Sequence, residues 1–201
     1  MTVTKIFYHT DFENHIPTLN NPECANRTKN IMGLIQKENF PNIALEEPEK
    51  IKKELIYAAH DKGFVDETIN KFPENDEIHY LDQETPVSSG SKDATLRAAG
   101  AGIDAINSII DGKSKNAFCI VRPPGHHACI NKSMGFCVFN NVAIAAYYLI
   151  NQYDYSNIAI VDFDVHHGNG TQDIFYNNKN VTYYSTHQYP LYPGTGDVDE
   201  V

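Results

Sequence analysis

The chain has 201 residues, a hydrophobic content of 41% and a formal net charge of −10. That length allows one α/β domain with a sizeable core, and the acidic balance argues against binding to nucleic acid or to an anionic membrane surface, both of which need a basic face. The N-terminus lacks the apolar segment of a signal peptide, and no apolar run approaches membrane-spanning length, so we expect a cytoplasmic protein.

Residue patterns in the N-terminal half alternate between short apolar runs and helical spacing. In order, they predict a strand at 3–9, a polar loop at 10–21, a helix from Pro22 to about Asn39, a connector at 40–48, an amphipathic helix at 49–60, a short helix and loop at 63–75, an extended piece at 78–81, a turn-rich segment at 82–91 and a helix at 91–111. Gly112 is well placed to end that last helix.

The C-terminal half continues the alternation. Its patterns predict a strand at 117–121, a stiff turn at 122–128, a loop at 134–137, a helix at 138–152, a strand from 158, a short helix at 171–176 and a strand at 181–186. Strands that alternate with helices predict a parallel sheet flanked by helices.

One stretch carries the strongest chemical signal. Residues 158–170 read Ile-Ala-Ile-Val-Asp-Phe-Asp-Val-His-His-Gly-Asn-Gly. The apolar, β-branched start predicts a strand buried on both faces, and the glycines predict its end. Because side chains alternate along a strand, we expect Asp164 and His166 to project the same way. A carboxylate beside an imidazole suits zinc or another borderline divalent metal.

The turn at 122–128 carries a second signal. It reads Arg-Pro-Pro-Gly-His-His-Ala and follows a predicted buried strand. The two prolines restrict the backbone, so His126 and His127 are presented with little freedom, as proton transfer requires. Ligands bind at the carboxyl ends of parallel strands, where both signals should lie, and we therefore expect one site.

These motifs together resemble the zinc-dependent histone deacetylase family, which also includes acetylpolyamine amidohydrolases and acetoin-utilisation proteins. The resemblance rests on Arg-Pro-Pro-Gly-His-His-Ala at 122–128, Gly-Phe-Cys at 135–137, Asp-Phe-Asp-Val-His-His-Gly-Asn-Gly-Thr-Gln at 162–172 and shorter matches at 81–91, 97–101 and 193–196. It implies a single domain over residues 1–201 with an arginase/deacetylase-type three-layer fold. The activity it implies is removal of acetyl groups from acetylated lysine in a protein or peptide, or from an acetylated small amine.

The resemblance also implies roles for individual residues. Asp164 and His166 would be zinc ligands, His126 and His127 the tandem acid/base pair, and Asp162 the carboxylate that orients His126.

Asn169 stands where some family members have an aspartate paired with the second histidine. Asparagine at this place is typical of the class II-like and bacterial branch, and an amide should raise the imidazole pKa less than a carboxylate would. The resemblance further implies a structural potassium ion near Asp162, Ser185 and Thr186.

For the substrate, the resemblance places Gly135 and Phe136 on the wall of an acyl-lysine channel and Asp82 at its rim. Arg27 is retained from the family's N-terminal motif, although that motif here reads Asn-Pro-Glu-Cys-Ala-Asn-Arg at 21–27, without its usual histidine and inner proline. From the residues alone, Arg27 and Asp82 are more typical of solvated surface positions.

Family domains continue beyond the length of this chain, and their later part carries a third zinc ligand, a further channel loop and a catalytic tyrosine. We therefore expect a C-terminally truncated domain that is catalytically incomplete alone and has a complementing C-terminal fragment as a partner. Two alternatives remain open at this point: a non-catalytic module that binds acetylated ligands or a partner, and an arginase-like hydrolase with two metal ions.

Overall fold

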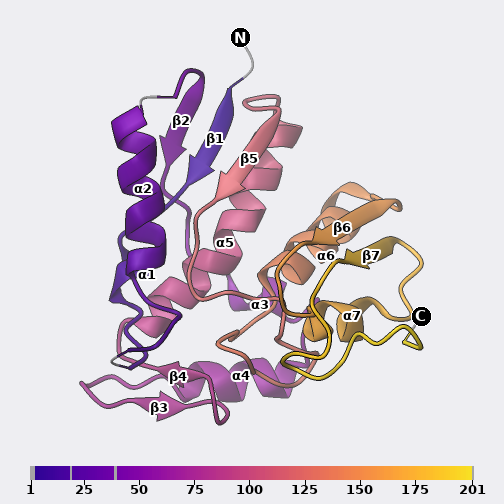
Figure 1. Ribbon diagram of the computed structural model, residues 1–201. Coiled ribbons are helices and arrows are strands. Elements are labelled where there is room, and N and C mark those ends of the chain that lie inside the picture. The colour runs from indigo at the N-terminus through magenta and orange to yellow at the C-terminus, as the bar shows by residue number, and fades with distance from the viewer. Residues whose placement is uncertain (1–2, 19, 39, 201) are drawn as a thin grey trace.

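The computed structural model describes residues 3–18, 20–38 and 40–200 (Figure 1). Its elements are, in chain order, β1 (Thr4–Phe7), α1 (Asp11–Asn14), α2 (Asn26–Glu38), β2 (Ile43–Glu46), α3 (Lys53–Ile56), α4 (Lys62–Asn70), β3 (His79–Tyr80), β4 (Pro86–Val87), α5 (Ser91–Ile110), β5 (Asn116–Cys119), α6 (Asn141–Tyr153), β6 (Ile158–Asp162), α7 (Asn169–Phe175) and β7 (Val181–Ser185). None of the helices in this described part is both long and apolar enough to cross a membrane.

A three-stranded parallel sheet forms the first layer, in the order β2-β1-β5. Side chains of β1 alternate between its two faces. Ile6 packs with Met32 and Ile35 of α2, and Phe7 packs with Ala101 and Ala105 of α5 on the other face. Helices therefore cover both faces of this sheet, which confirms the predicted α/β architecture (Figure 1).

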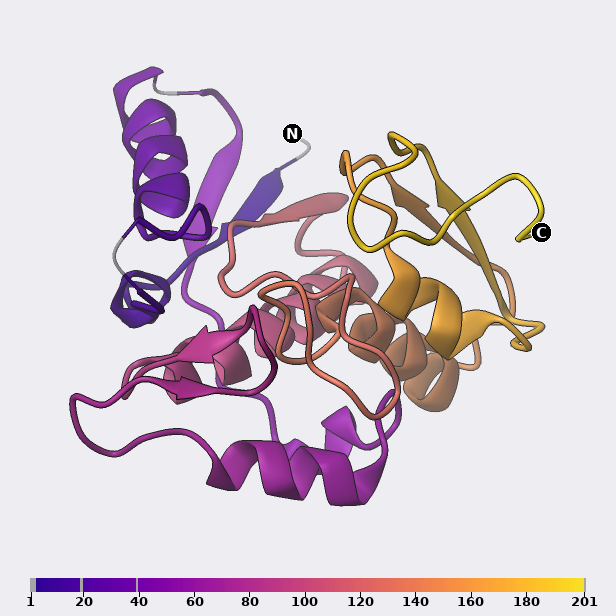
Figure 2. The same ribbon diagram turned by 60° about the horizontal axis from the view of Figure 1, so that its bottom comes forward.

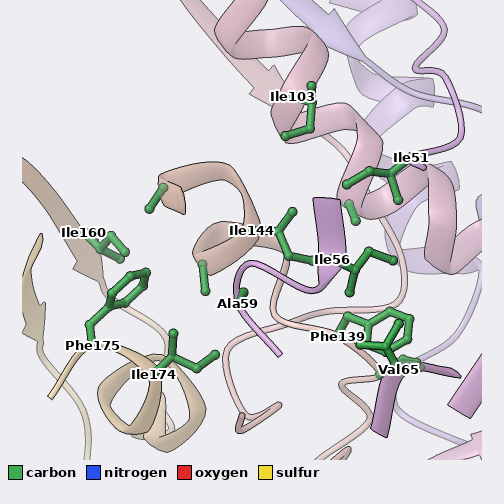
Figure 3. Close-up of a cluster of buried hydrophobic side chains, with 14 of the residues drawn as sticks. Ile51, Ile56, Ala59, Val65, Ile103, Phe139, Ile144, Ile160, Ile174 and Phe175 are labelled. Carbon is green, nitrogen blue, oxygen red and sulfur yellow. The ribbon is translucent and has the colours of Figure 1, made fainter. Parts of the chain in front are cut away.

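A second parallel pair, β6 and β7, runs in register from Ile158 opposite Val181 to Asp162 opposite Ser185. The largest core cluster lies beneath one face of this pair. Figure 3 shows Ile160 of β6 beside Phe175 of α7, and Ile144 of α6 in the same cluster. Burial of these side chains holds the strand pair in place and thereby positions the carboxyl ends of β6 and β7.

The other face of β6 is open, which corrects the prediction of a strand buried on both sides. Val161 is 63% exposed and Phe163 is 85% exposed. Among the described residues, β5 pairs only with β1 and β6 only with β7. A cleft of about 570 Å³ lies beside β6, lined by Val121, Val161 and Phe163 among others. The exposure follows because helices α6 and α7 pack on one face only.

The N-terminal predictions were wrong in several boundaries. Helix α2 begins at Asn26 rather than Pro22, and Asn39 lies outside the described residues. The predicted loop at 10–21 contains α1, and the predicted connector at 40–48 contains β2. Both elements are only four residues long, so their pattern is too short to be recognised without the tertiary partners that stabilise them.

Two further segments differ from prediction for the same kind of reason. Within 49–60 only Lys53–Ile56 is helical, because Ile51 donates its backbone N–H to the carbonyl of Leu96 instead of to a helical turn. Strand β4 lies inside the segment predicted to be turns, where it pairs antiparallel with β3. Helix α5 confirms its prediction, and Gly112 follows its end with φ +70°.

His60 connects the segment between α3 and α4 to the loop that precedes α6. Its Nδ1 donates to the carbonyl oxygen of Cys129 at 2.8 Å, and its Nε2 accepts from the backbone N–H of Asn140 at 2.9 Å. Only a neutral imidazole can do both. Burial lowers the pKa of His60 from 6.5 to about 4.

We therefore predict a pH-dependent loss of stability that originates at His60. The unfolded chain gains a proton on this residue near pH 6.5, whereas the folded chain does not until about pH 4, so its contribution, roughly 3 kcal/mol, is complete above pH 6.5 and is lost as the pH falls towards 4. The free energies of unfolding of the wild type and His60→Gln, from urea denaturation, should converge over this range. A His79→Gln control, at an exposed site, should show no such convergence; a pH-independent gap between wild type and His60→Gln would contradict the prediction.

The turn at 134–137 is held by two backbone hydrogen bonds between Met134 and Cys137. Its central residues, Gly135 and Phe136, have φ of +55° and +67°. Positive φ at both positions is the geometry of a tight type I′ turn, and it is unfavourable for Phe. A Cβ on Gly135 would lie 2.5 Å from Cδ2 of His127. The absence of a side chain at residue 135 therefore lets this turn lie against His127.

We predict that Gly135→Ala destabilises the fold more than a matched glycine substitution. Gly112→Ala, with φ +70° and nothing near its Cβ, should cost only the backbone strain of roughly 1–2 kcal/mol. Gly135→Ala should add roughly 1–3 kcal/mol for the clash with His127. Chemical denaturation of the two variants gives the comparison, and equal losses of stability would show that the close approach to His127 carries no cost.

Candidate active site

A pocket of about 430 Å³ opens where β5 and β6 end. Segments far apart in the sequence form it. Figure 2 shows the salmon-coloured loops of the central part of the chain between the indigo N-terminal elements and the yellow C-terminal segment. Its lining residues are Pro22, Glu23, Arg27, Glu84, Pro124, His126, His127, Gly135, Phe136, Asp164, His166 and Tyr192. The two signals predicted to share one site, the histidine pair and the Asp164/His166 pair, therefore line the same cavity.

A buried ion pair anchors the turn that carries the histidines. Arg122 is fully buried at the end of the β5 segment, and its guanidinium binds both carboxylate oxygens of Glu23 at 2.5 and 2.7 Å. It also donates to the carbonyl oxygens of Phe12 and His15. Hydrogen bonds from His15 and Arg122 outweigh the effect of burial and lower the pKa of Glu23 to about 2. This pair joins the N-terminal segment to the Pro-Pro-Gly-His-His turn.

His126 is oriented by a carboxylate. Its Nδ1 lies 2.9 Å from Oδ2 of Asp162, at the end of β6. Burial alone would raise the pKa of Asp162, but the hydrogen bond and charge interaction with His126 lower it, so the group is a carboxylate at neutral pH. An Nδ1–H donated to Asp162 leaves Nε2 of His126 free to accept a proton.

His127 is oriented by an amide. Its Nδ1 lies 2.8 Å from Oδ1 of Asn169, the first residue of α7, while Nδ2 of Asn169 points to the sulfur atoms of Cys129 and Met134 at 3.5 Å each. Burial and the neighbouring His126 lower the pKa of His127 to about 4, although the bond to Asn169 opposes that shift. At neutral pH, His127 is therefore uncharged, with Nε2 as an acceptor.

Asp164 and His166 lie in a bend just after β6, not within an extended strand as predicted. They still converge, because Oδ1 of Asp164 accepts the backbone N–H of His166 at 2.8 Å. The same oxygen lies 3.1 Å from Nδ1 of His166. That separation fits two donors bound to one ion at the ~2.0–2.2 Å bond lengths of zinc.

Carboxylate oxygen and imidazole nitrogen are donors that zinc accepts, so these two residues fit part of a zinc site. Among the residues the structure describes, no group of three His, Cys, Asp or Glu side chains could hold a metal ion. Catalytic zinc normally takes three protein ligands, of which Asp164 and His166 would supply two.

The residues expected near potassium lie together but make other contacts here. The carbonyl oxygen of Asp162 accepts the backbone N–H of Thr186 at 3.0 Å, and Oγ of Ser185 lies 2.8 Å from Nδ1 of His187. Their role in binding potassium stays a prediction.

Aromatic side chains form the wall of the pocket. The positive φ of Phe136 turns this residue onto the pocket lining. Tyr192, which sequence reasoning missed, packs edge-on against His127 with ring centroids 5.0 Å apart. Burial, then the charges of Glu84 and Asp82, raise the pKa of Tyr192. The motif at 193–196 lies next to Tyr192 in the sequence and was the signal that could have identified it.

The two predicted rim residues, Arg27 and Asp82, line different cavities. Arg27 lines the pocket and lies 3.3 Å from Glu23, whereas Asp82 lines a neighbouring cavity together with Glu84 and Tyr192. Glu84 touches both cavities, so it stands nearer to the pocket than the predicted Asp82 does. Glu23 was also missed, because an acidic residue in a loop gives no sign in the sequence of a buried arginine 99 positions away.

Comparisons with known proteins indicate the family of this chain. Residues 21–201 match the model of the histone deacetylase domain. A "Probable deacetylase" of Archaeoglobus fulgidus is 38% identical over 98% of this chain and 55% of its own length. Histone deacetylase 15 of Arabidopsis thaliana is 37% identical over 98% of this chain and 36% of its own length, and histone deacetylase 9 of Homo sapiens is 48% identical over 55% of this chain and 11% of its own.

The fold has a close counterpart among solved structures. The crystal structure of the HDA15 HD domain superimposes with a TM-score of 0.92 at 34% identity, covering 100% of this chain and 58% of that one. The chain thus spans about half the length of relatives that it matches from end to end. With its α/β fold and its match over residues 21–201, the chain belongs to the histone deacetylase domain family.

Proposed function

We propose that the chain is the N-terminal part of a zinc-dependent amidohydrolase that removes acetyl groups from acetylated lysine or an acetylated small amine. The observation that carries this proposal is the shared pocket, in which two oriented histidines face the Asp164/His166 donor pair. Membership of the deacetylase family and the printed name of the archaeal relative support the same reaction class.

In this proposal, Asp164 and His166 hold zinc together with one further ligand. When bound, zinc would polarise the amide carbonyl and lower the pKa of a water molecule. The chain's contribution is to keep the two donor atoms 3.1 Å apart through the backbone hydrogen bond between these residues.

The histidine pair would move the protons. His127, neutral and with Nε2 free, is suited to accept a proton from water. His126 is suited to take up a proton at its free Nε2 and pass it to the leaving amine, because its Nδ1 stays bonded to the carboxylate of Asp162. Hydrogen bonds at both Nδ1 atoms fix the ring orientations before substrate arrives, which lowers the entropic cost of the reaction.

The pocket wall favours a substrate that has an aliphatic stem and positively charged groups close to it. The rings of Phe136 and Tyr192 would pack on the methylene groups, and the carboxylates of Glu84 and Asp82 lie at the outer side. The formal charge of −10 would attract the same positively charged substrates.

We also propose that a C-terminal segment completes the enzyme. Two features of the described residues support it: only two metal donors converge, and the facing edges of β5 and β6 have no partner strand. Exposed Val161 and Phe163 beside that gap give such a segment apolar surface to bury.

Zinc binding is the first test. In isothermal titration of the metal-free chain, Asp164→Ala should weaken zinc affinity by more than roughly 100-fold, because loss of a direct ligand should exceed the 10–100-fold typical for loss of an outer hydrogen-bond partner. Asp76→Ala, which removes an exposed loop carboxylate, is the matched control and should bind as the wild type does. Unchanged affinity in Asp164→Ala would refute the ligand assignment.

Turnover is the second test. Zinc-loaded chain should hydrolyse an acetyl-lysine peptide or an acetylated polyamine only when a fragment matching the remaining domain of the archaeal relative is added. In that complex, His127→Gln should lower kcat by roughly 10²–10⁴-fold, and His79→Gln, at an exposed site, should not. Turnover by the chain alone would refute the need for a C-terminal segment.

A non-catalytic alternative has one observation in its favour, the incomplete donor set. A module of that kind would bind an acetylated peptide equally well with and without zinc. It would hydrolyse no substrate in the turnover assay, whether or not the C-terminal fragment is added and whether or not His127 is replaced by Gln.

A further inference from the structure

Tyr183 of β7 reaches into the hydrogen-bond network beneath the site. Its hydroxyl group donates to Oδ2 of Asp162 at 3.0 Å, the same oxygen that receives Nδ1 of His126 at 2.9 Å. The parallel register explains the contact, because Tyr183 lies opposite Ile160 and so stands diagonally next to Asp162 on the same face of the pair.

The direction of this hydrogen bond is fixed by the charge state of Asp162. An ionised carboxylate can only accept hydrogen bonds, so the phenol hydroxyl group of Tyr183 is the donor to Asp162. Gly168 lies so close to this pair that a Cβ on it would overlap both Oδ2 of Asp162 and the phenol oxygen. The absence of a side chain at residue 168 therefore keeps the phenol and the carboxylate in contact.

Both oxygens of Asp162 are thereby held. Oδ1 accepts the backbone N–H of Asp164 at 3.1 Å, and Oδ2 accepts from Tyr183 and His126. If the phenol were absent, Oδ2 would keep only His126 as a side-chain donor, and the carboxylate could turn about its Cβ–Cγ bond. A second imidazole tautomer, with the proton on Nε2, would then become accessible to His126.

We propose that Tyr183 is a positioning residue: by holding the Asp162 carboxylate, its phenol keeps His126 in the tautomer that leaves Nε2 free. This assignment rests on the proposed acid/base function of His126. Tyr183 touches neither the pocket nor a reacting atom, and it acts only through Asp162.

The competing explanation is that Tyr183 merely fills the core, since its ring packs against the main apolar cluster. Tyr183→Phe separates the two roles, because Phe keeps the ring and removes only the hydroxyl group. Tyr184→Phe is a matched control on the same strand: Tyr184 is 56% exposed and points to the opposite face.

The test is nitrogen-15 NMR of the histidine side chains in the full chain, which reports the tautomer without needing turnover. In the wild type and in Tyr184→Phe, His126 should show a slowly exchanging proton on Nδ1. In Tyr183→Phe, that proton should exchange roughly tenfold faster or more, the change expected from loss of one hydrogen bond to a charged group, and signal from the Nε2–H tautomer should appear.

Unchanged exchange and tautomer in a folded Tyr183→Phe protein would overturn the proposal. A measurement on the unaltered protein guards against a variant that fails to fold: the hydroxyl proton of Tyr183 should be protected from exchange with water, and a freely exchanging hydroxyl proton would also overturn it. Because neither readout uses turnover, failure of the deacetylase proposal would leave this result intact, and the reverse also holds.

Discussion

The buried pair of Arg122 and Glu23 is the interaction on which the site depends. Removing two charges from water costs several kcal/mol for each ion, and the pair repays this only because the guanidinium is satisfied by both carboxylate oxygens and by main-chain carbonyls. Those contacts tie the N-terminal segment to the end of the β5 segment. The histidine turn begins one residue later, so the pocket wall at Pro22–Arg27 and the acid/base pair are held by one interaction.

Beyond this ion pair, each histidine has its own hydrogen-bond partner: Asp162 holds His126, and Asn169 holds His127. The carboxylate of Asp162 is shared between His126, Tyr183 and the backbone of Asp164, so it links the acid/base pair to the metal-donor bend. Asn169 adds no charge and turns its amide nitrogen to sulfur atoms, which are weak acceptors. The two histidines therefore sit in different electrostatic surroundings, and this difference favours separate roles in proton transfer.

Sequence reasoning recovered the features that depend on local chemistry. The long helix α5, the strand at β6 and the shared position of the two histidine motifs followed from periodicity, turn residues and the rule for parallel sheets. It failed for features whose conformation is decided by tertiary contacts. Strand β2 exists because β1 pairs with it, and the Asp164/His166 bend is shaped by a backbone hydrogen bond rather than by strand alternation. Glu23 and Tyr183 act through partners distant in the sequence, so periodicity and turn residues do not mark them.

The two halves of the candidate site differ in how firmly the described residues hold them. The side chain of His126 is only 18% exposed and His127 is buried, and each has a hydrogen-bond partner with good geometry. Asp164 and His166 are 49% and 41% exposed and bond mainly to each other. Exposed donors with few partners gain order only when an ion or a further chain segment binds them. The acid/base half is thus organised in advance, and metal binding is the step at which the proposed centre would become complete.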